Sequence, residues 1–164
     1  MNKGEYWEKG GESLRRATLC FLGDGDRVLL AMKKRGFGEG RWNGVGGKVG
    51  EDEELIEAAK REAREEIGVE ITELSEVAVL DFLFVDKPEW DQRVVVFWVD
   101  VWEGEPQESE EMAPAWYGRE EIPYEEMWSD DIHWLPLVLG GKKVKGVFWF
   151  GDNDEVLDMR IEEL

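Results

Sequence analysis

Cysteine and histidine are almost absent from this sequence. It contains one cysteine, Cys20, and one histidine among 164 residues. A lone cysteine excludes an intrachain disulfide, and the two residue types together are too few for a zinc-ligand set. Because Cys20 lies in an apolar run with no base nearby, we expect it to be a core residue rather than a nucleophile. These absences favour a reducing compartment, and we expect a cytoplasmic protein.

Long apolar runs and positive charge are also scarce. No stretch is long and apolar enough to cross a bilayer, and the N-terminal residues show no signal-peptide pattern. Asp and Glu number 39 against 20 Lys and Arg, which gives a net charge of −19. This charge argues against binding to nucleic acid backbones. We therefore expect neither a membrane nor a nucleic acid as partner, whereas a small anionic substrate stays compatible if a metal and local basic groups reverse the field.

The remaining composition is that of a packed globular domain, with 42% apolar and 12% aromatic residues. Residues 1–13 are polar and predict a loosely held tail, and residues 14–164 predict one domain. The expected strands cover 17–22, 27–32, 77–85, 93–101, 113–117, 144–150 and 155–161. Helices are expected at 52–67, at 119–127 with an internal interruption at Pro123, and at 129–139, and a loop is expected at 33–50. Strands outnumber the interspersed helices, so the expected class is α+β, with helices packed on a mixed β-sheet.

The helix expected at 52–67 carries carboxylates where a helix disfavours them. Glu62, Glu65 and Glu66 share one face in its last turns. Like charges at these spacings repel by about 0.2–0.5 kcal/mol per pair, and carboxylates near a helix C-terminus oppose the macrodipole. One interpretation is a solvated acidic face, offset in part by neighbouring arginines. The other is a bound divalent cation such as Mg²⁺, which prefers oxygen ligands.

The spacing around this face is specific. From Gly47 to Val69 the chain fills every defined position of the pattern G-x5-E-x7-R-E-U-x-E-E-x-G-U, in which U is apolar. The stretch therefore resembles the Nudix box. The resemblance implies a Nudix fold, which is an α-β-α sandwich with a central mixed β-sheet, and it implies hydrolysis of a phosphoanhydride bond.

The resemblance also implies a Mg²⁺ site, at which Mn²⁺ can replace Mg²⁺. The implied ligands are the Gly46 carbonyl and the carboxylates of Glu62, Glu65, Glu66 and Glu111. The general base stays open between Glu65 and Glu111. Arg61 is expected to form an ion pair with Glu53 that fixes the preceding loop against the helix. Gly46 and Gly47 permit close approach of the backbone to phosphate.

The similarity extends beyond the box, because Arg27–Lys48 and several later segments resemble the animal-type MutT homologues of this family, which hydrolyse oxidised purine nucleoside triphosphates. The substrate-binding residues predicted from this resemblance and from side-chain chemistry are Thr18, Lys33, Phe37, Asn43, Val45, Gly46, Gly47, Lys48, Phe82, Trp128, Ser129, Asp130, Asp131 and Trp134. Val45 and Ser129 stand where those homologues carry phenylalanine and proline, so the ranking of substrates stays open.

Base recognition is expected from aromatic and acidic residues together. Stacking in an aromatic slot contributes about 1–3 kcal/mol per base. Two adjacent carboxyls, Asp130 and Asp131, can share a proton so that one donates and the other accepts a hydrogen bond. Alternating protonation would let one pocket accept both 8-oxo-guanine and 2-hydroxyadenine. The competing interpretation is that one aspartate caps the helix after Ser129.

The resulting prediction is a Mg²⁺-dependent enzyme that converts oxidised purine (deoxy)nucleoside triphosphates, such as 8-oxo-dGTP and 2-hydroxy-dATP, to monophosphate and pyrophosphate. Water would attack the β-phosphorus, and the reaction would clear damaged nucleotides from the pool. We expect a monomer with a small-molecule nucleotide as its partner. The alternatives are a Nudix enzyme for methylated purine triphosphates, diadenosine polyphosphates or nucleotide sugars, and a non-catalytic nucleotide-sensing module.

Overall fold

The computed structural model describes residues 14–164, so the predicted tail at residues 1–13 lies outside the described residues. The strands are β1 (Arg15–Asp24), β2 (Arg27–Lys33), β3 (Trp42–Asn43), β4 (Val45–Lys48), β5 (Glu70–Phe84), β6 (Gln92–Glu103), β7 (Met112–Gly118), β8 (Val144–Phe150) and β9 (Val156–Glu163). The α-helices are α2 (Leu55–Ile67) and α3 (Asp131–Leu139), and the 3₁₀ turns are η1 (Pro88–Trp90), η2 (Tyr124–Glu126) and η3 (Asp152–Asp154).

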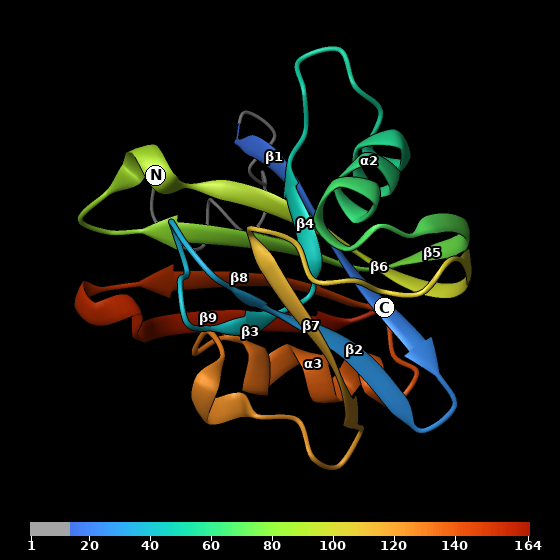
Figure 1. The fold of residues 1–164 in the computed structure, drawn as a ribbon. Coiled ribbons are helices and arrows are strands. Elements are labelled where there is room, and N and C mark those ends of the chain that lie inside the picture. Colours follow the sequence, from blue (N-terminus) through green and yellow to red (C-terminus); the bar gives the residue numbers. More distant parts are fainter. Residues whose placement is uncertain (1–13) are drawn as a thin grey trace.

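The strands form one mixed sheet in the order β3-β2-β1-β6-β5-β8-β9, with β4 paired to β1 and β7 paired to β2. The pairs β1–β6 and β5–β8 are parallel, and the remaining pairs are antiparallel. Helices α2 and α3 lie on opposite sides of this sheet (Figure 1). The predicted α+β class and its sandwich of helix, sheet and helix are confirmed.

Alternation along the strands divides the core into two layers. In β1, Cys20 packs in the layer under α2, whereas its neighbour Phe21 packs in the layer under α3. Successive side chains of a strand point to opposite faces, so one strand serves both layers. The ring of Phe21 meets Trp134 of α3 edge to face, with centroids 6.0 Å apart. Burial of such side chains contributes about 1.5–3 kcal/mol each and fixes both helices against the sheet. Cys20 is fully buried, as predicted.

Helix α2 begins three residues later than predicted because its expected start is used by a turn. The Gly50 N–H donates to Glu53 Oε1 at 2.9 Å, and the Glu53 N–H donates to the Gly50 carbonyl at 3.1 Å. This turn holds the chain out of helical geometry up to Leu55. The predicted stop is confirmed, since Gly68 takes the left-handed conformation with φ of 70°.

Two other expectations are wrong. The segment 33–50 was expected to be a loop but contains β3 and β4. These strands have two and four residues, which is too short for a readable alternation. The helix expected at 119–127 is reduced to the single turn η2. Pro123 lacks an N–H and disfavours helical geometry in the residue before it, so the helix cannot extend. Over the described part of the chain, no helix is long and apolar enough to cross a membrane.

Strand β1 changes partner along one of its edges. Residues Ala17–Cys20 pair with β4, and residues Leu22–Asp24 pair with β2. The other edge of β1 pairs with β6 over Arg15–Leu22. Strands β2 and β4 therefore diverge from a common neighbour, and residues from all three strands line the main pocket.

Candidate active site

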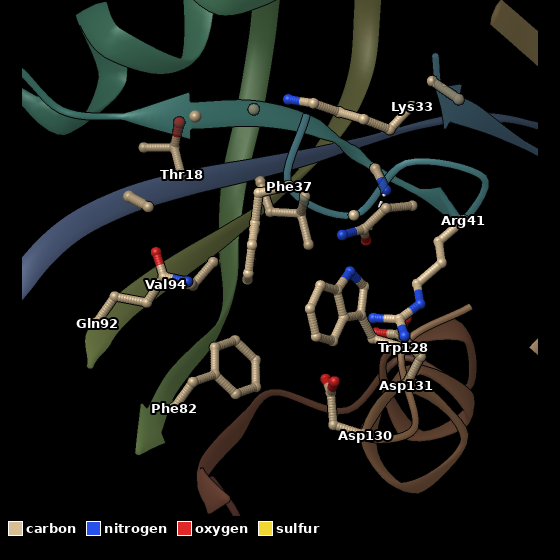
Figure 2. Close-up of a pocket in the computed structure, with 18 of the residues that line it drawn as sticks. Thr18, Lys33, Phe37, Arg41, Phe82, Gln92, Val94, Trp128, Asp130 and Asp131 are labelled. Carbon is tan, nitrogen blue, oxygen red and sulfur yellow. Dashed lines mark hydrogen bonds between the residues drawn. The ribbon is translucent and has the colours of Figure 1, made fainter. Parts of the chain in front are cut away.

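The main pocket brings together most of the residues predicted to bind substrate. They come from β1, β2, the loop before β3, β3 itself, β4, β5 and the segment around the start of α3, and together they line one cavity (Figure 2). The predicted residues that line it are Thr18, Lys33, Phe37, Asn43, Gly46, Gly47, Phe82, Trp128, Asp130, Asp131 and Trp134. Residues from distant parts of the sequence thus converge as expected for one binding site.

Three predicted substrate-binding residues do not line this pocket. Val45 is buried in the layer under α2, on the other side of the sheet. Lys48 is exposed, and its carbonyl accepts a hydrogen bond from Arg61 Nη2 at 3.1 Å. Ser129 donates from its hydroxyl to the Asp154 carbonyl at 2.6 Å. Each of them supports a neighbouring segment instead of facing the cavity.

The two aspartates at the start of α3 are buried, with 3% of Asp130 and 2% of Asp131 exposed. Trp134 Nε1 donates to Asp130 Oδ2 at 2.7 Å, whereas Asp131 Oδ2 has no hydrogen-bond partner. Asp130 occupies the N-cap position of α3, but its side chain forms no capping hydrogen bond with the backbone of the helix. The capping interpretation is therefore wrong, because the Asp130 carboxylate instead accepts a hydrogen bond from the tryptophan one turn later.

Burial changes the acidity of this pair. It raises the pKa of Asp130 to about 6, against the opposing effects of the Trp134 N–H and the Arg41 charge. Burial also raises the pKa of Asp131 well above its ordinary value, and the negative charge of Asp130 adds to this rise. At neutral pH the pair therefore favours an ionised Asp130, which accepts hydrogen bonds, beside a protonated Asp131, which donates one.

An aromatic wall adjoins the aspartates. The ring of Phe37 lies 5.1 Å from that of Trp128 and 5.1 Å from that of Trp90, and 52% of Phe37 is exposed. Gly36 and Gly38 on either side of Phe37 have φ of 81° and 86°, a backbone conformation that other residues rarely adopt. This glycine-flanked loop presents an apolar ring at the pocket mouth, where it can cover a bound base.

The glutamate face of α2 is organised by Arg61. Its guanidinium donates to both carboxylate oxygens of Glu53, at 2.8 and 3.0 Å, which confirms the predicted ion pair. It also donates to Glu62 at 2.9 Å and to Glu65 at 3.2 Å. The hydrogen bonds from Arg61 lower the pKa of Glu53 to about 2. Arg61 thus ties the turn before α2 to the first two predicted metal ligands.

Glu66 is the uncompensated member of this face. Only 5% of it is exposed, and its Oε2 has no hydrogen-bond partner. Burial, followed by the hydrogen bond and negative charge of Glu62, raises the pKa of Glu66 to about 8. Within residues 14–164, no three Asp, Glu, His or Cys side chains form a closed metal-binding group. The orphaned oxygen beside Glu62 nevertheless fits a hard divalent cation, since oxygen donors and excess negative charge are what such a cation requires.

Two glycines connect the pocket to the glutamates. A Cβ on Gly46 would lie 1.9 Å from the Thr18 carbonyl oxygen, and a Cβ on Gly47 would lie 2.7 Å from Glu62 Oε1. Only glycine fits at position 46, where the clash is with backbone, whereas a side chain at position 47 would displace the end of the Glu62 side chain. Lys33 lines the same pocket, and its charge acts on Glu66. The cavity that contains the aspartates is therefore lined by two glycines, of which Gly47 lies next to Glu62, whereas no glutamate of α2 is itself part of the lining.

Glu111 lies on the outer side of this region. Its half-exposed carboxylate is 3.5 Å from Arg35 Nη2, and its charge contributes to the raised pKa of Glu66. Its carbonyl accepts a hydrogen bond from the Lys34 N–H at 2.8 Å, which holds the acidic loop against the end of β2. The structure thus places Glu111 near the box glutamates although it is far away in the sequence.

Sequence reasoning missed several residues that line the pocket. The polar ones are Arg41 and Gln92, and the large apolar ones are Leu19, Phe84, Val94, Met112 and Phe150. Gln92 alternates with Val94 at the start of β6, which could have placed both on one face. Arg41 stood out only as a basic residue, since its acidic partner Asp154 lies 113 positions away in the sequence.

Comparisons with known proteins identify relatives by sequence and by fold. The model of the NUDIX domain matches residues 13–138. The chain is 46% identical over 150 residues to the oxidized purine nucleoside triphosphate hydrolase of Mus musculus, covering 92% of this chain and 96% of that protein. The Danio rerio protein of the same name is 43% identical over 147 residues, with 90% and 94% covered. The crystal structure of a MutT protein from Bacillus halodurans superposes with a TM-score of 0.81 at 27% identity, covering 91% of this chain and 98% of that one.

Proposed function

The chain belongs to the Nudix family, and we propose that it hydrolyses oxidised purine (deoxy)nucleoside triphosphates, such as 8-oxo-dGTP and 2-hydroxy-dATP, to monophosphate and pyrophosphate. The observation that carries this proposal is that one pocket contains a buried aspartate pair together with Gly46 and Gly47, of which Gly47 lies next to Glu62 on the glutamate face of α2. One end offers hydrogen bonds to a base, and the other offers carboxylates to a metal–triphosphate complex. The names of the vertebrate relatives support the same substrate class.

The base end suits a purine whose edge has been altered by oxidation. Asn43 Oδ1 accepts a hydrogen bond from the Gly44 N–H at 2.8 Å, so its amide NH₂ is oriented to donate. Asp130 and Asp131 add an acceptor and a donor in a buried setting. A site whose buried polar groups would be left unpaired rejects a base that lacks the matching group. We propose that exchange of the proton between the two aspartates lets the pocket accept both oxidised bases.

The phosphate end suits metal-assisted hydrolysis. Glu62, Glu65 and Glu66, with the Gly46 carbonyl, would hold Mg²⁺, and Mn²⁺ would substitute for it. When bound, the cation neutralises phosphate charge and activates the electrophile. Arg61 keeps Glu62 and Glu65 in place through its anchor on Glu53. Lys33, on the pocket wall, supplies positive charge toward the phosphates.

One protein group must remove a proton from the attacking water. Glu65 and Glu111 are the two candidates, and the side chains of both are about half exposed, where water reaches them. Attack at the β-phosphorus would release the monophosphate and pyrophosphate. If Glu65 is the base, Glu65→Gln lowers kcat more than Glu111→Gln does, and the reverse order assigns the role to Glu111.

The test is steady-state kinetics of the purified protein with 8-oxo-dGTP, 2-hydroxy-dATP, O6-methyl-dGTP and dGTP, each with and without Mg²⁺. We expect kcat/KM to be highest for the two oxidised purines and turnover to stop without a divalent cation. Higher turnover of the methylated purine, of a diadenosine polyphosphate or of a nucleotide sugar would replace the proposed substrate by another one. Absence of all turnover would favour a nucleotide-sensing module.

The remaining expectations about the whole protein stay predictions. We propose that residues 14–164 act as one domain, which is supported by the pairing of β8 with β5 beyond the NUDIX match. We also propose that the protein is a cytoplasmic monomer that acts on the free nucleotide pool. Size-exclusion chromatography with light scattering would test the monomer.

A further inference from the structure

Arg41 lies at the meeting point of three chain segments beside the base end of the pocket. Its guanidinium carbon is 4.1 Å from the ring centroid of Trp128, and its Nη2 is 3.1 Å from Asp154 Oδ2. Figure 2 shows Arg41 extending from its loop toward Trp128 and the two aspartates. We name Arg41, Trp128 and Asp154 the Arg41 triad.

Each member of the Arg41 triad is held by its own segment. The Arg41 N–H donates to the Gly38 carbonyl, and the Arg41 carbonyl accepts from the Lys33 N–H at 3.2 Å, which fixes the loop. Asp154 is in the turn between β8 and β9, where its φ of 58° is unusual for a residue other than glycine. The Ser129 hydroxyl, next to Trp128, donates to the Asp154 carbonyl. A strained turn that meets both the arginine and the segment before α3 is suited to holding them in register.

The charge of Arg41 also reaches the buried aspartates. It favours the ionised form of Asp130, in opposition to burial. The groups around that carboxylate are Asp131 and Trp134 on α3 and Arg41 from the loop before β3. Tyr124 of η2 lies near Asp131. Burial raises the pKa of this tyrosine, and the negative charge of Asp131 adds to the rise. Among these neighbours, Arg41 is the positively charged group.

We propose that Arg41 is a positioning residue for base recognition. Anchored by Asp154, it holds the Trp128 ring against the pocket and keeps Asp130 in its hydrogen-bond-accepting form. This inference rests on the proposed function for the identity of the substrate, whereas the contacts of Arg41 do not depend on that function. It assigns a role in the site to the β8–β9 turn, which lies outside the region matched by the NUDIX domain.

Arg41→Gln tests the proposal because glutamine removes the charge and keeps a polar side chain. We expect KM for 8-oxo-dGTP to rise about 10-fold with kcat changed less than about twofold, since a cation–π contact and an ion pair are lost away from the reacting atoms. Loss of the positive charge raises the pKa of Asp130, so the pH below which KM increases should move up. Arg41→Lys keeps the charge and should restore that pH while KM stays partly raised.

Arg27 provides a matched control. It also lies over a tryptophan, Trp116, at 4.9 Å, and its Nη2 is 3.0 Å from Asp24 Oδ2, but neither Arg27 nor Trp116 lines the pocket. Arg27→Gln should leave KM and its pH dependence unchanged. If Arg41→Gln behaves as Arg27→Gln does, the proposal is wrong. Asp154→Asn should raise KM by a smaller factor than Arg41→Gln and add nothing in the double variant, whereas an additive effect would remove Asp154 from the proposal.

A second measurement separates this inference from the proposed function. The titration of Asp130 can be followed by NMR of protein labelled with ¹³C at the aspartate carboxyls, with Asp130→Asn to assign the resonance. Its midpoint should rise in Arg41→Gln and stay in place in Arg41→Lys and Arg27→Gln. An unmoved midpoint in Arg41→Gln contradicts the inference even if oxidised purines are the substrates. A moved midpoint supports it even if the wild-type protein prefers another nucleotide.

Discussion

The aspartate end of the pocket and the adjoining glutamate end on α2 hold carboxylates under opposite conditions. On α2, Glu62 and Glu65 lie within hydrogen-bond distance of Arg61 and keep contact with solvent. On α3, Asp130 and Asp131 are buried, and their immediate partners are each other and a tryptophan N–H. A carboxylate taken out of water must be neutralised by a cation or by a proton. The first end is built to use a cation, and the second is built to use a proton.

Glu66 is the point at which the two conditions meet. It belongs to the α2 face by position, but its burial and its unpartnered Oε2 resemble those of Asp131. A proton neutralises it in the free protein, because its pKa is raised to about 8. We expect a divalent cation to displace that proton when the substrate complex binds. The following changes test whether the two ends respond as differently as this comparison requires.

The largest effect is expected at Glu66. Glu66→Gln keeps the shape of the side chain but removes the charge that would hold the cation, so kcat with Mg²⁺ should fall about 100- to 1,000-fold. The control is Glu57→Gln, an exposed position in the first turn of the same helix. Without metal, Glu66→Gln should unfold no earlier than the wild type in thermal melts. Retained turnover in this variant would show that the glutamate end does not depend on a cation at Glu66.

The next effect concerns base preference at the opposite end. Asp130→Asn and Asp131→Asn should each reduce the preference for 8-oxo-dGTP over dGTP about 10- to 100-fold, because one buried hydrogen-bonding group worth about 1–3 kcal/mol is lost. Turnover of dGTP itself should change little. Asp100→Asn, at an exposed position in β6, serves as the control. Unchanged discrimination in both variants would contradict base reading by the aspartate pair.

A third effect is a dependence of stability on pH that belongs to the aspartate end. The pKa of Asp130 is raised to about 6, so between about pH 4 and pH 6 this carboxyl holds a proton in the folded protein more often than in the unfolded chain. The contribution of Asp130 to stability is therefore fully present at lower pH and is lost as the pH rises through about 6. Relative to the wild type, Asp130→Asn should gain on the order of 2 kcal/mol in the free energy of unfolding between pH 4.5 and 7.5.

Urea denaturation at the two pH values measures this gain. The contribution of Glu66 to the free energy of unfolding also decreases toward pH 8. This decrease is the same in both proteins, so it cancels in the difference between variant and wild type. A difference between variant and wild type that is independent of pH would mean that Asp130 titrates as an ordinary exposed carboxyl. Such a result would contradict the proposal that the buried carboxylates at the start of α3 are neutralised by a proton.

The smallest effect is expected at the anchor of the α2 end. Glu53→Gln removes the charge that orients Arg61, so Glu62 and Glu65 should be held less firmly and kcat should fall about 3- to 10-fold. Because the pKa of Glu53 is lowered to about 2, this loss should be constant from pH 5 to 8. Glu51→Gln, an exposed neighbour, should have no effect. A pH-dependent loss would assign Glu53 a role beyond fixing Arg61.

Long elements with a clear periodicity were predictable from sequence. The strands around 17–22 and 27–32, the last hairpin and the main helix were found because alternation and helical spacing reflect which side chains are buried. Two short strands in the glycine-rich segment, β3 and β4, were not found. Their existence depends on pairing with β2 and β1, which no local pattern records.

The site was predictable to the extent that its residues are adjacent in sequence or match a family pattern. The pair Asp130–Asp131 and the box glutamates were identified, and the pocket indeed contains the aspartates. Arg41 and Gln92 were missed as pocket residues. The signal for Arg41 is its contact with Asp154, and this contact exists only because the β8–β9 turn folds back onto the segment before α3.

The sequence by itself determined the spacing that places three glutamates at one helix end. It also determined a pair of glycines that permits close approach of the backbone, and an acidic pair next to tryptophans. Spacing and residue type act locally, so they can be read from the chain alone. The tertiary structure decided which polar oxygens are buried without a partner, which glutamate faces solvent, and that the aspartate pair shares one cavity with the glycine beside Glu62. Burial and electrostatic balance depend on groups that packing brings together from distant positions, and for this reason they appear only in the folded protein.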